Sequence, residues 1–419
     1  MKNIYSYFAL FLLMILSSCG SDDDPAAVTD TQNPTIPLNL VVSNITETGA
    51  TLSWEAASDN VGVTGYQLYE NGILSETGIP GTSFSVSALM VETEYDFRVT
   101  AIDAAGNESN MSNTNSFFTL STALVFENNL SNMGVFTSAL SNLTPAAGVQ
   151  LYEINSTLFT DYAKKQRLVR LPNGQKMEYN NNNLLPKFPD NTLIAKTFYY
   201  NLDETNPSSG QKIIETRVFI KVDGVWIPGN YVWNETQTEA TYRETGSIEN
   251  IDYTDINGTA RNINYVIPAK DDCFTCHNNN SETFPIGMKL RSMNFTPSYT
   301  NQNQLDHFGT LGILDGVTSS NISLLPDWTD ASLDILDRGR AYIDINCAHC
   351  HQPGGEVINF DLDFRLETIF EDTGIYVNRG EIEVRTQSNL TTYRMPQIGR
   401  SIVHEEAVTM LLEYLEAIE

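Results

Sequence analysis

Two short runs of cysteine and histidine carry the most specific chemistry in the chain. One reads Cys-Phe-Thr-Cys-His at residues 273–277, and the other reads Cys-Ala-His-Cys-His at residues 347–351. Two thiols three residues apart on a turn can reach both vinyl groups of one haem, and the next histidine then lies under the iron as proximal ligand. The sequence therefore predicts two covalent haem c cofactors. The residues predicted to hold them are Cys273, Cys276, His277, Cys347, Cys350 and His351.

Two other uses of the cysteine pairs are open at this point. Four thiolates could hold one structural zinc ion, because zinc favours tetrahedral sulfur ligation. The pairs could also form local disulfides or a thioredoxin-like redox motif. Neither use explains why a histidine directly follows each pair, so the sequence favours haem.

The distal iron ligands are less evident than the proximal ones. Met395, in the Tyr-Arg-Met-Pro stretch at residues 393–396, is the predicted distal ligand of the second haem. A thioether opposite an imidazole favours ferrous iron and raises the reduction potential. For the first haem the candidate distal ligands are Met288, Met293 and His307, and Met288 is the one we select. A further alternative is a five-coordinate iron with no distal ligand.

The second motif lies between two predicted helices. Residues 337–346 lead into it and contain Gly339, and the amphipathic residues 405–418 contain Tyr414. In cytochromes c two such helices cross, and a small residue against an aromatic ring allows a close approach. A backbone carbonyl of residues 353–355 is expected to orient the proximal imidazole.

The N-terminus has the features of a lipoprotein signal. Lys2 precedes a mostly apolar stretch at residues 4–16, and Leu-Ser-Ser-Cys at residues 16–19 resembles a lipobox. Cys19 is the predicted lipidated residue, and the acidic residues 20–24 resemble a cell-surface sorting tag. We expect a lipid anchor at the outer membrane or surface of a Gram-negative bacterium, with the periplasmic side as the alternative.

The overall charge limits the class of partner. The chain has 52 Asp and Glu residues against 24 Lys and Arg residues, for a net charge of −28. Such a surface repels phosphate backbones, which argues against nucleic acid as a partner. The expected partner is a redox protein with a basic docking patch.

Short alternating apolar runs separated by turn residues predict a β-sandwich over residues 34–120. This segment resembles a fibronectin type III domain. The resemblance rests on Trp54, on the strand at residues 65–69, on Leu89 with Tyr95, and on residues 103–109. The expected strands are residues 38–42, 50–54, 65–69, 83–86 and 95–101. The domain is expected to serve as a spacer, since no exposed aromatic platform is evident.

The rest of the chain is expected to form two further domains. Glycine-containing turns at residues 171–174 and 222–225 predict hairpins, the second joining strands at residues 214–220 and 225–233. The fold class is thus multidomain: an all-β sandwich, a β-rich middle domain and a mainly α dihaem domain like cytochrome c. The expected division is a signal peptide at residues 1–18, an acidic tether at 19–33, and domains at 34–120, 121–265 and 266–419.

Residues 121–419 resemble a family of bacterial dihaem c-type cytochromes. The resemblance rests on both haem motifs and on short matches in a shared order. These are residues 158–165, 196–198, 215–217, 231–234, 303–305, 340–342 and 346–355. The family implies electron transfer without a firm substrate.

Electron transfer outside the cytoplasm is therefore the expected function, and a non-catalytic carrier is favoured over an enzyme. One rival is a dihaem peroxidase or oxidase, although the two motifs lie closer together than is usual for dihaem peroxidases. Another is adhesion or glycan binding through the fibronectin type III domain. Hydrolase motifs are missing, and His404-Glu405-Glu406 lacks the second histidine of a zinc protease.

Overall fold

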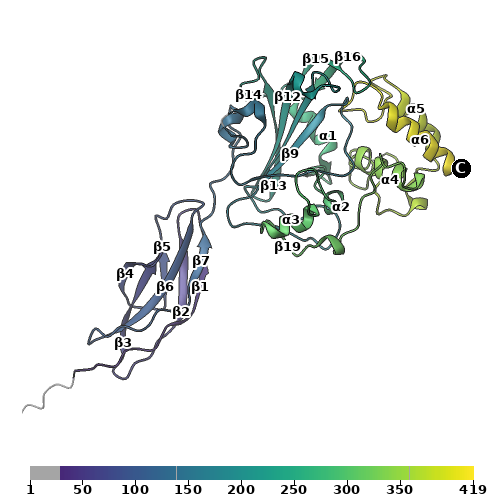
Figure 1. Cartoon of the computed structure of the whole chain (residues 1–419). Coiled ribbons are helices and arrows are strands. Elements are labelled where there is room, and N and C mark those ends of the chain that lie inside the picture. Colours follow the sequence, from purple (N-terminus) through teal and green to yellow (C-terminus); the bar gives the residue numbers. More distant parts are fainter. Residues whose placement is uncertain (1–28, 138, 358) are drawn as a thin grey trace, which may run out of the picture. The chain divides into compact units, whose positions relative to one another are not determined.

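The computed structural model describes residues 29–137, 139–357 and 359–419, which form two compact units (Figure 1). One unit comprises residues 29–44, 50–86 and 95–117, and the other comprises 45–49, 87–94 and the described residues of 118–419. The signal peptide and Cys19 lie outside the described residues, so lipid attachment stays a prediction. Within the described ranges, no helix is long and apolar enough to cross a bilayer.

The smaller unit is a sandwich of two antiparallel sheets. One sheet has the order β1 (Leu38–Ser43), β2 (Ala50–Glu55), β5 (Ser83–Val86). The other has the order β4 (Ile73–Ile79), β3 (Val63–Glu70), β6 (Glu94–Asp103), β7 (Asn115–Phe118). The five expected strands are confirmed. The sequence did not indicate β4, because six of its seven residues are exposed and alternation is absent.

The expected core residues of the sandwich are buried. Trp54 and Tyr66 pack edge to face with ring centroids 5.4 Å apart. Leu89 and Tyr95 are also buried. Each buried aromatic ring contributes a large apolar area to the core between the two sheets.

The larger unit contains a six-stranded antiparallel sheet. Its order is β14 (Ala240–Tyr242), β13 (Val225–Trp233), β12 (Gln211–Val222), β11 (Leu193–Asn201), β9 (Lys164–Arg170), β8 (Val149–Leu151). The predicted hairpin joins β12 to β13. Asp223 and Gly224 at its tip have φ of 50° and 78°, the left-handed values that a two-residue turn between twisted strands requires.

The other predicted hairpin, the one at residues 171–174, is wrong. These residues do turn, since the backbone N–H of Gln175 donates to the carbonyl of Pro172 at 3.0 Å. The strand before the turn, β9, already pairs with β8 and β11. The strand after it, β10 (Met177–Glu178), pairs in parallel with β19 (Leu314–Asp315). A turn motif fixes a change of direction but not the partner of the next strand.

The two faces of the sheet are covered by different parts of the chain. The 3-10 turns η1 (Leu130–Met133) and η2 (Leu140–Asn142) share a core with Leu168, Leu193 and Val218 on one face. The hairpin of β15 (Ser247–Thr254) and β16 (Ala260–Ile267) shares a core with residues of the opposite face, among them Phe198 and Val232.

The C-terminal half does not form a separate, mainly α domain, which corrects the expected boundary between residues 265 and 266. One core joins Val169, Ile194 and Phe219 of the sheet to Leu305 and Phe308. The helices involved are α2 (Leu290–Met293) and α3 (Gln304–Thr310), which are too short to bury a core of their own. Beyond residue 315 the described residues form helices and loops with a core of their own, so the larger unit combines the sheet with a helical C-terminal part.

Two longer helices behave as the sequence predicts. The helix α4 (Ile335–Asn346) leads into the second cysteine motif, and α6 (Glu405–Ala417) packs against it. A Cβ atom placed on Gly339 would lie 2.2 Å from the ring of Tyr414. The absence of a side chain at Gly339 therefore sets how closely α4 and α6 approach.

We predict that Gly339→Ala lowers the free energy of unfolding by about 2 kcal/mol, because the added methyl group displaces a buried ring. The matched control is Gly380→Ala in α5 (Arg379–Gln387), where an added Cβ meets nothing within 4 Å. The control should be neutral or stabilising by up to about 1 kcal/mol, from helix propensity alone. Equal destabilisation of both variants in denaturant unfolding would contradict the close crossing.

Candidate functional site

The fold brings the two cysteine motifs together. The Sγ atoms of Cys276 and Cys350 and a ring nitrogen of His349 all lie within 4.8 Å of one another. The Cys350 thiol donates to the carbonyl of Thr275 at 3.6 Å. All four cysteines of the motifs are free thiols. Sequence reasoning passed over His349, although its place between the two cysteines of the second motif could have drawn attention to it.

The first motif lies on α1 (Lys270–Cys276). A carboxylate oxygen of Asp272 accepts from the backbone N–H of Ala269 at 2.9 Å and so caps the start of this helix. Cys273 and Cys276 are three residues apart and so lie on one face of the helix. The short hairpin of β17 (Asn278–Asn279) and β18 (Glu282–Thr283) then turns the chain back over His277.

The imidazole of His277 is held in one orientation. Its Nδ1 lies 2.8 Å from the carbonyl oxygen of Phe284. Because a carbonyl only accepts, Nδ1 carries the proton, and Nε2 is left with a free lone pair. Burial and the nearby charge of Lys196 lower the pKa of His277 to about 3. The ring is therefore neutral at pH 7, the form that can bind a metal.

The imidazole of His351 is less constrained. Burial, with a smaller effect of His349, lowers its pKa to about 4, so it too is neutral at pH 7. Its Nδ1 is buried without a hydrogen-bond partner among the described residues. The expectation that a carbonyl of residues 353–355 orients this ring is therefore wrong. The Gly354 carbonyl instead accepts from the backbone N–H of Asn280 at 2.7 Å, which ties the two motifs together.

Each motif lines its own cavity. Cys347, Cys350 and His351 share a cavity of about 80 Å³ with Met395 and Pro396. The stretch at residues 393–396 is thus brought beside the second motif, as its position in the sequence suggested.

The cavity of the first motif has a different lining. Cys273, Cys276 and His277 face side chains of the sheet across a cavity of about 60 Å³. No methionine lines this cavity in the described part of the chain. The structure places Met288 and Met293, both 0% exposed, in the apolar core instead, since each packs among leucine and phenylalanine side chains.

His307 does not line the cavity of the first motif either. It is on α3, where its ring is 6.1 Å from that of Tyr299 and 6.3 Å from that of Phe308. In the described part of the chain, the lining of the cavity that holds His277 therefore includes none of the three expected distal ligands of the first haem.

The sequence left zinc and haem as alternative cofactors, and the donor atoms of the two motifs can be compared with what each cofactor requires. A four-cysteine zinc site is not assembled, because the metal-competent cluster holds only Cys276, His349 and Cys350. In contrast, both cysteines and the neutral histidine of each motif line one cavity. The buried, unpartnered Nδ1 atoms of His349 and His351 mark polar groups that the chain itself does not satisfy. The chemistry of these donor sets suits one haem for each motif.

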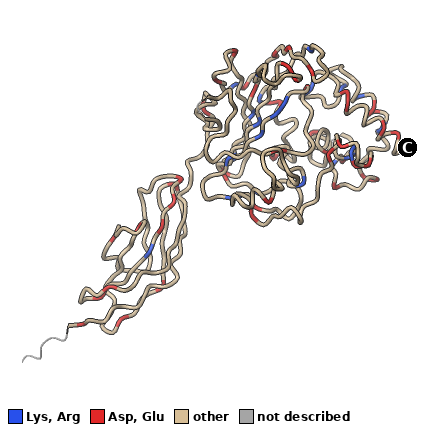
Figure 2. Tube along the Cα trace, in the orientation of Figure 1, with Lys and Arg blue, Asp and Glu red and all other residues tan. Residues whose placement is uncertain are grey.

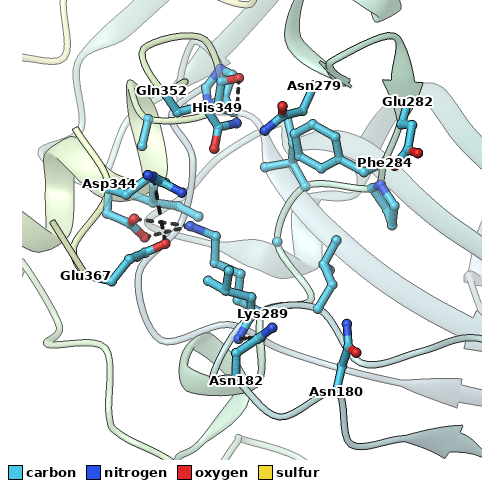
Figure 3. Close-up of a pocket in the computed structure, with 18 of the residues that line it drawn as sticks. Asn180, Asn182, Asn279, Glu282, Phe284, Lys289, Asp344, His349, Gln352 and Glu367 are labelled. Atoms are coloured by element: carbon cyan, nitrogen blue, oxygen red, sulfur yellow. Dashed lines mark hydrogen bonds and ion pairs between the residues drawn. The ribbon is translucent and has the colours of Figure 1, made fainter. Parts of the chain in front are cut away.

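A third, larger cavity of about 460 Å³ opens beside the motifs (Figure 3). Its lining is rich in carboxamides and includes one phenyl ring, that of Phe284. The carboxamides belong to Asn180, Asn182, Asn279, Asn280 and Gln352. Together they offer hydrogen-bond donors and acceptors in similar numbers.

Ion pairs form one wall of this cavity (Figure 3). The carboxylate of Asp344, fully buried, lies 2.8 Å from Arg291 Nη2 and 3.1 Å from Lys289 Nζ. Glu367 lies 2.7 Å from Arg291 Nη1. Burial alone would raise the pKa of Asp344, but Lys289 and Arg291 outweigh burial and hold this pKa below its ordinary value. The pairs join α4 to the segment that begins α2.

Comparison with known proteins bears on the smaller unit. The fibronectin type III family model matches residues 33–117. Those residues form a fibronectin type III domain. The chain is 51% identical over 84 residues to Chitinase A1 of Niallia circulans, which is 20% of this chain and 12% of that protein. It is 49% identical over 80 residues to Chitinase Chi52 of Paenibacillus xylanexedens, covering 19% and 15%. It is 45% identical over 89 residues to an Alpha-amylase of Niallia circulans, covering 21% and 7%.

These findings correct the expected function. The relatives that match the fibronectin type III domain carry the names of enzymes that act on polysaccharides, and this finding overturns the expectation of a haem-based electron carrier. The expected basic redox partner is not tested by these matches and stays a prediction. The three matches span about a fifth of this chain and no more than 15% of each relative, so haem attachment at residues 273–277 and 347–351 also stays a prediction.

We predict that Asp344→Asn lowers the free energy of unfolding by about 3 kcal/mol, because it leaves buried cations without their shared carboxylate. Since the pKa of Asp344 is lowered by folding, its stabilisation is present above the ordinary carboxyl pKa near 4 and is lost as pH falls through the folded value. The control is Glu381→Gln, which removes an exposed ion pair with Arg385 and should cost less than about 1 kcal/mol. Equal costs in denaturant unfolding at pH 7 would refute the prediction.

Proposed function

We propose that this protein binds polysaccharide. The observation that carries the proposal is the 51% identity between its fibronectin type III domain and the matching region of Chitinase A1. Identity at this level over a single domain supports a shared target, carbohydrate, more than a shared catalytic reaction. The proposal therefore concerns carbohydrate binding and not hydrolysis.

The fibronectin type III domain itself is a weak candidate for the binding surface. The large apolar side chains exposed on residues 33–117 are aliphatic or methionine, as at Ile73, Val61 and Met90, and none of them is aromatic. Sugar rings stack best on flat aromatic faces. The domain is therefore proposed to be the spacer, and the larger unit to hold the sugar.

The carboxamide-rich cavity is the proposed sugar site (Figure 3). Sugar hydroxyl groups both donate and accept, so they suit asparagine and glutamine side chains, which do the same. Phe284 offers an apolar ring in the same lining. A volume of about 460 Å³ lies in the range of small-molecule sites, about 300–1,000 Å³.

We expect the full chain to sediment with at least one of insoluble chitin, cellulose and starch. Asn180→Ala combined with Gln352→Ala should weaken that binding at least about tenfold, as loss of two hydrogen bonds implies. Asn301→Ala, an exposed asparagine outside the cavity lining, is the control. No binding by the full chain would end the proposal. Equal binding by all variants would show that the sugar site lies outside this cavity.

We also propose that Cys273, Cys276 and His277 hold one covalent haem, and Cys347, Cys350 and His351 a second, with Met395 as the distal ligand there. The hydrogen bond from His277 Nδ1 to the Phe284 carbonyl supports this, since it aims Nε2 as a proximal ligand must be aimed. The shared cavity of His351 and Met395 supports the second site. When bound, each haem would supply a redox-active iron. The chain's own residues would anchor and orient it.

Protein produced with cytochrome c maturation machinery should contain two haems per chain in a pyridine haemochrome assay. Cys347→Ser with Cys350→Ser should leave one haem, and the Met395→Ala variant should keep both but lose the weak far-red band of methionine-ligated ferric iron. Zinc with no covalent haem, measured by elemental analysis, would refute the proposal.

A further inference from the structure

A row of positive charges crosses the central sheet. Arg167 on β9 pairs directly with Lys196 on β11, and Lys196 pairs directly with Arg217 on β12. The row continues to Asn230 on β13. Neighbouring strands are about 4.8 Å apart, so the three cations are adjacent on one face of the sheet. Figure 2 shows basic residues gathered along these strands.

This row lies between two apolar clusters on the same face. Val169 and Ile194 belong to the cluster on one side, and Phe198 and Val232 belong to the cluster on the other. Side chains two residues apart on a strand share a face, so the cations cannot turn away to solvent without disrupting both clusters. Like charges directly opposite each other destabilise a sheet.

The acidic groups nearby neutralise only part of the row. Glu215 lies 2.5 Å from Arg217 Nη2, which gives Arg217 a counter-charge, and also accepts from the hydroxyl of Tyr265 at 2.7 Å. The carboxylate of Asp161 accepts from the backbone N–H groups of Ser401 and Ile402. Lys165, two residues from Arg167 on the same strand, is a further basic side chain and lies 5.7 Å from the ring of Phe198.

Several polar groups of the row lack partners. Among the described residues, no ion pair involves Arg167 or Lys196. The Nε atoms of Arg167 and Arg217 and both amide atoms of Asn230 are buried without hydrogen bonds. Arg167 is 6% exposed and Asn230 is 4% exposed. An unsatisfied polar row in a buried position indicates a ligand that satisfies it.

Lys196 and Arg217 line the same cavity as Cys273, Cys276 and His277. The only acidic side chain in that lining is Asp272, whose carboxylate already caps α1. The cavity is thus apolar on the side of Phe159 and positive on the side of the sheet. A ligand that fits it is flat or apolar in part and carries an acidic group at one edge.

We infer that Lys196 and Arg217 form a binding site for the carboxylate groups of a ligand held in this cavity. Two ligands could supply such carboxylate groups. One is the acidic edge of the haem proposed for Cys273, Cys276 and His277, in which case the inference rests on the second proposal above. The other is a uronic acid unit of a polysaccharide, in which case it rests on the first.

The experiment uses the full chain, made with and without cytochrome c maturation, in two variants. Lys196→Met removes one charge while keeping the length of the side chain, and Arg217→Lys keeps the charge while losing the planar fork. Lys176→Met, which removes a half-exposed lysine outside the cavity, is the control. Haem content is measured first, so failure of the cofactor proposal is seen separately.

In the haem-bearing chain, resonance Raman bands of the haem carboxylates should shift in both variants and not in the control. In the chain without haem, trimeric glucuronate should raise the melting temperature of the wild type. The apparent affinity of the Lys196→Met variant for trimeric glucuronate should be at least tenfold weaker than that of the wild type. A Raman shift alone identifies the haem edge as the ligand, and glucuronate stabilisation alone identifies a sugar acid. Unchanged Raman bands together with no effect of glucuronate would overturn the inference, whether or not haem is attached.

Discussion

The six-stranded sheet of the larger unit depends on having both faces covered. One face receives a local cover, because η1 and η2 precede the first strand and fold over it. The other face combines two apolar clusters with a row of cations across β9, β11 and β12. Residues between Tyr152 and Phe188 and residues of the C-terminal half together cover that face. This cover must exclude water and leave the cations a counter-charge.

This constraint places the two cysteine motifs side by side. The first motif follows β16 directly on α1, which packs near β13. The second motif ends α4, which is fixed to the start of α2 by the ion pairs of Asp344 with Lys289 and Arg291. As a result Cys276, His349 and Cys350 meet within 4.8 Å, although their motifs are far apart in the chain.

The two units indicate different aspects of function. The fibronectin type III domain relates the protein to enzymes named for action on chitin and starch. The larger unit offers a carboxamide-rich cavity beside two donor sets suited to haem. A protein that binds polysaccharide and carries haem is compatible with both units, and neither observation replaces the other.

The sequence by itself determined the features that depend on local spacing. These are the sandwich strands around Trp54, the turn at Asp223 and Gly224, the helices on either side of the second motif, and the approach of Gly339 to Tyr414. Only the tertiary structure decided which distant segments share a core. It merged the two expected C-terminal domains into one unit, moved Met288 into the core, and aligned Arg167, Lys196 and Arg217. Strand register and the covering of a sheet face depend on long-range burial, which no local pattern specifies.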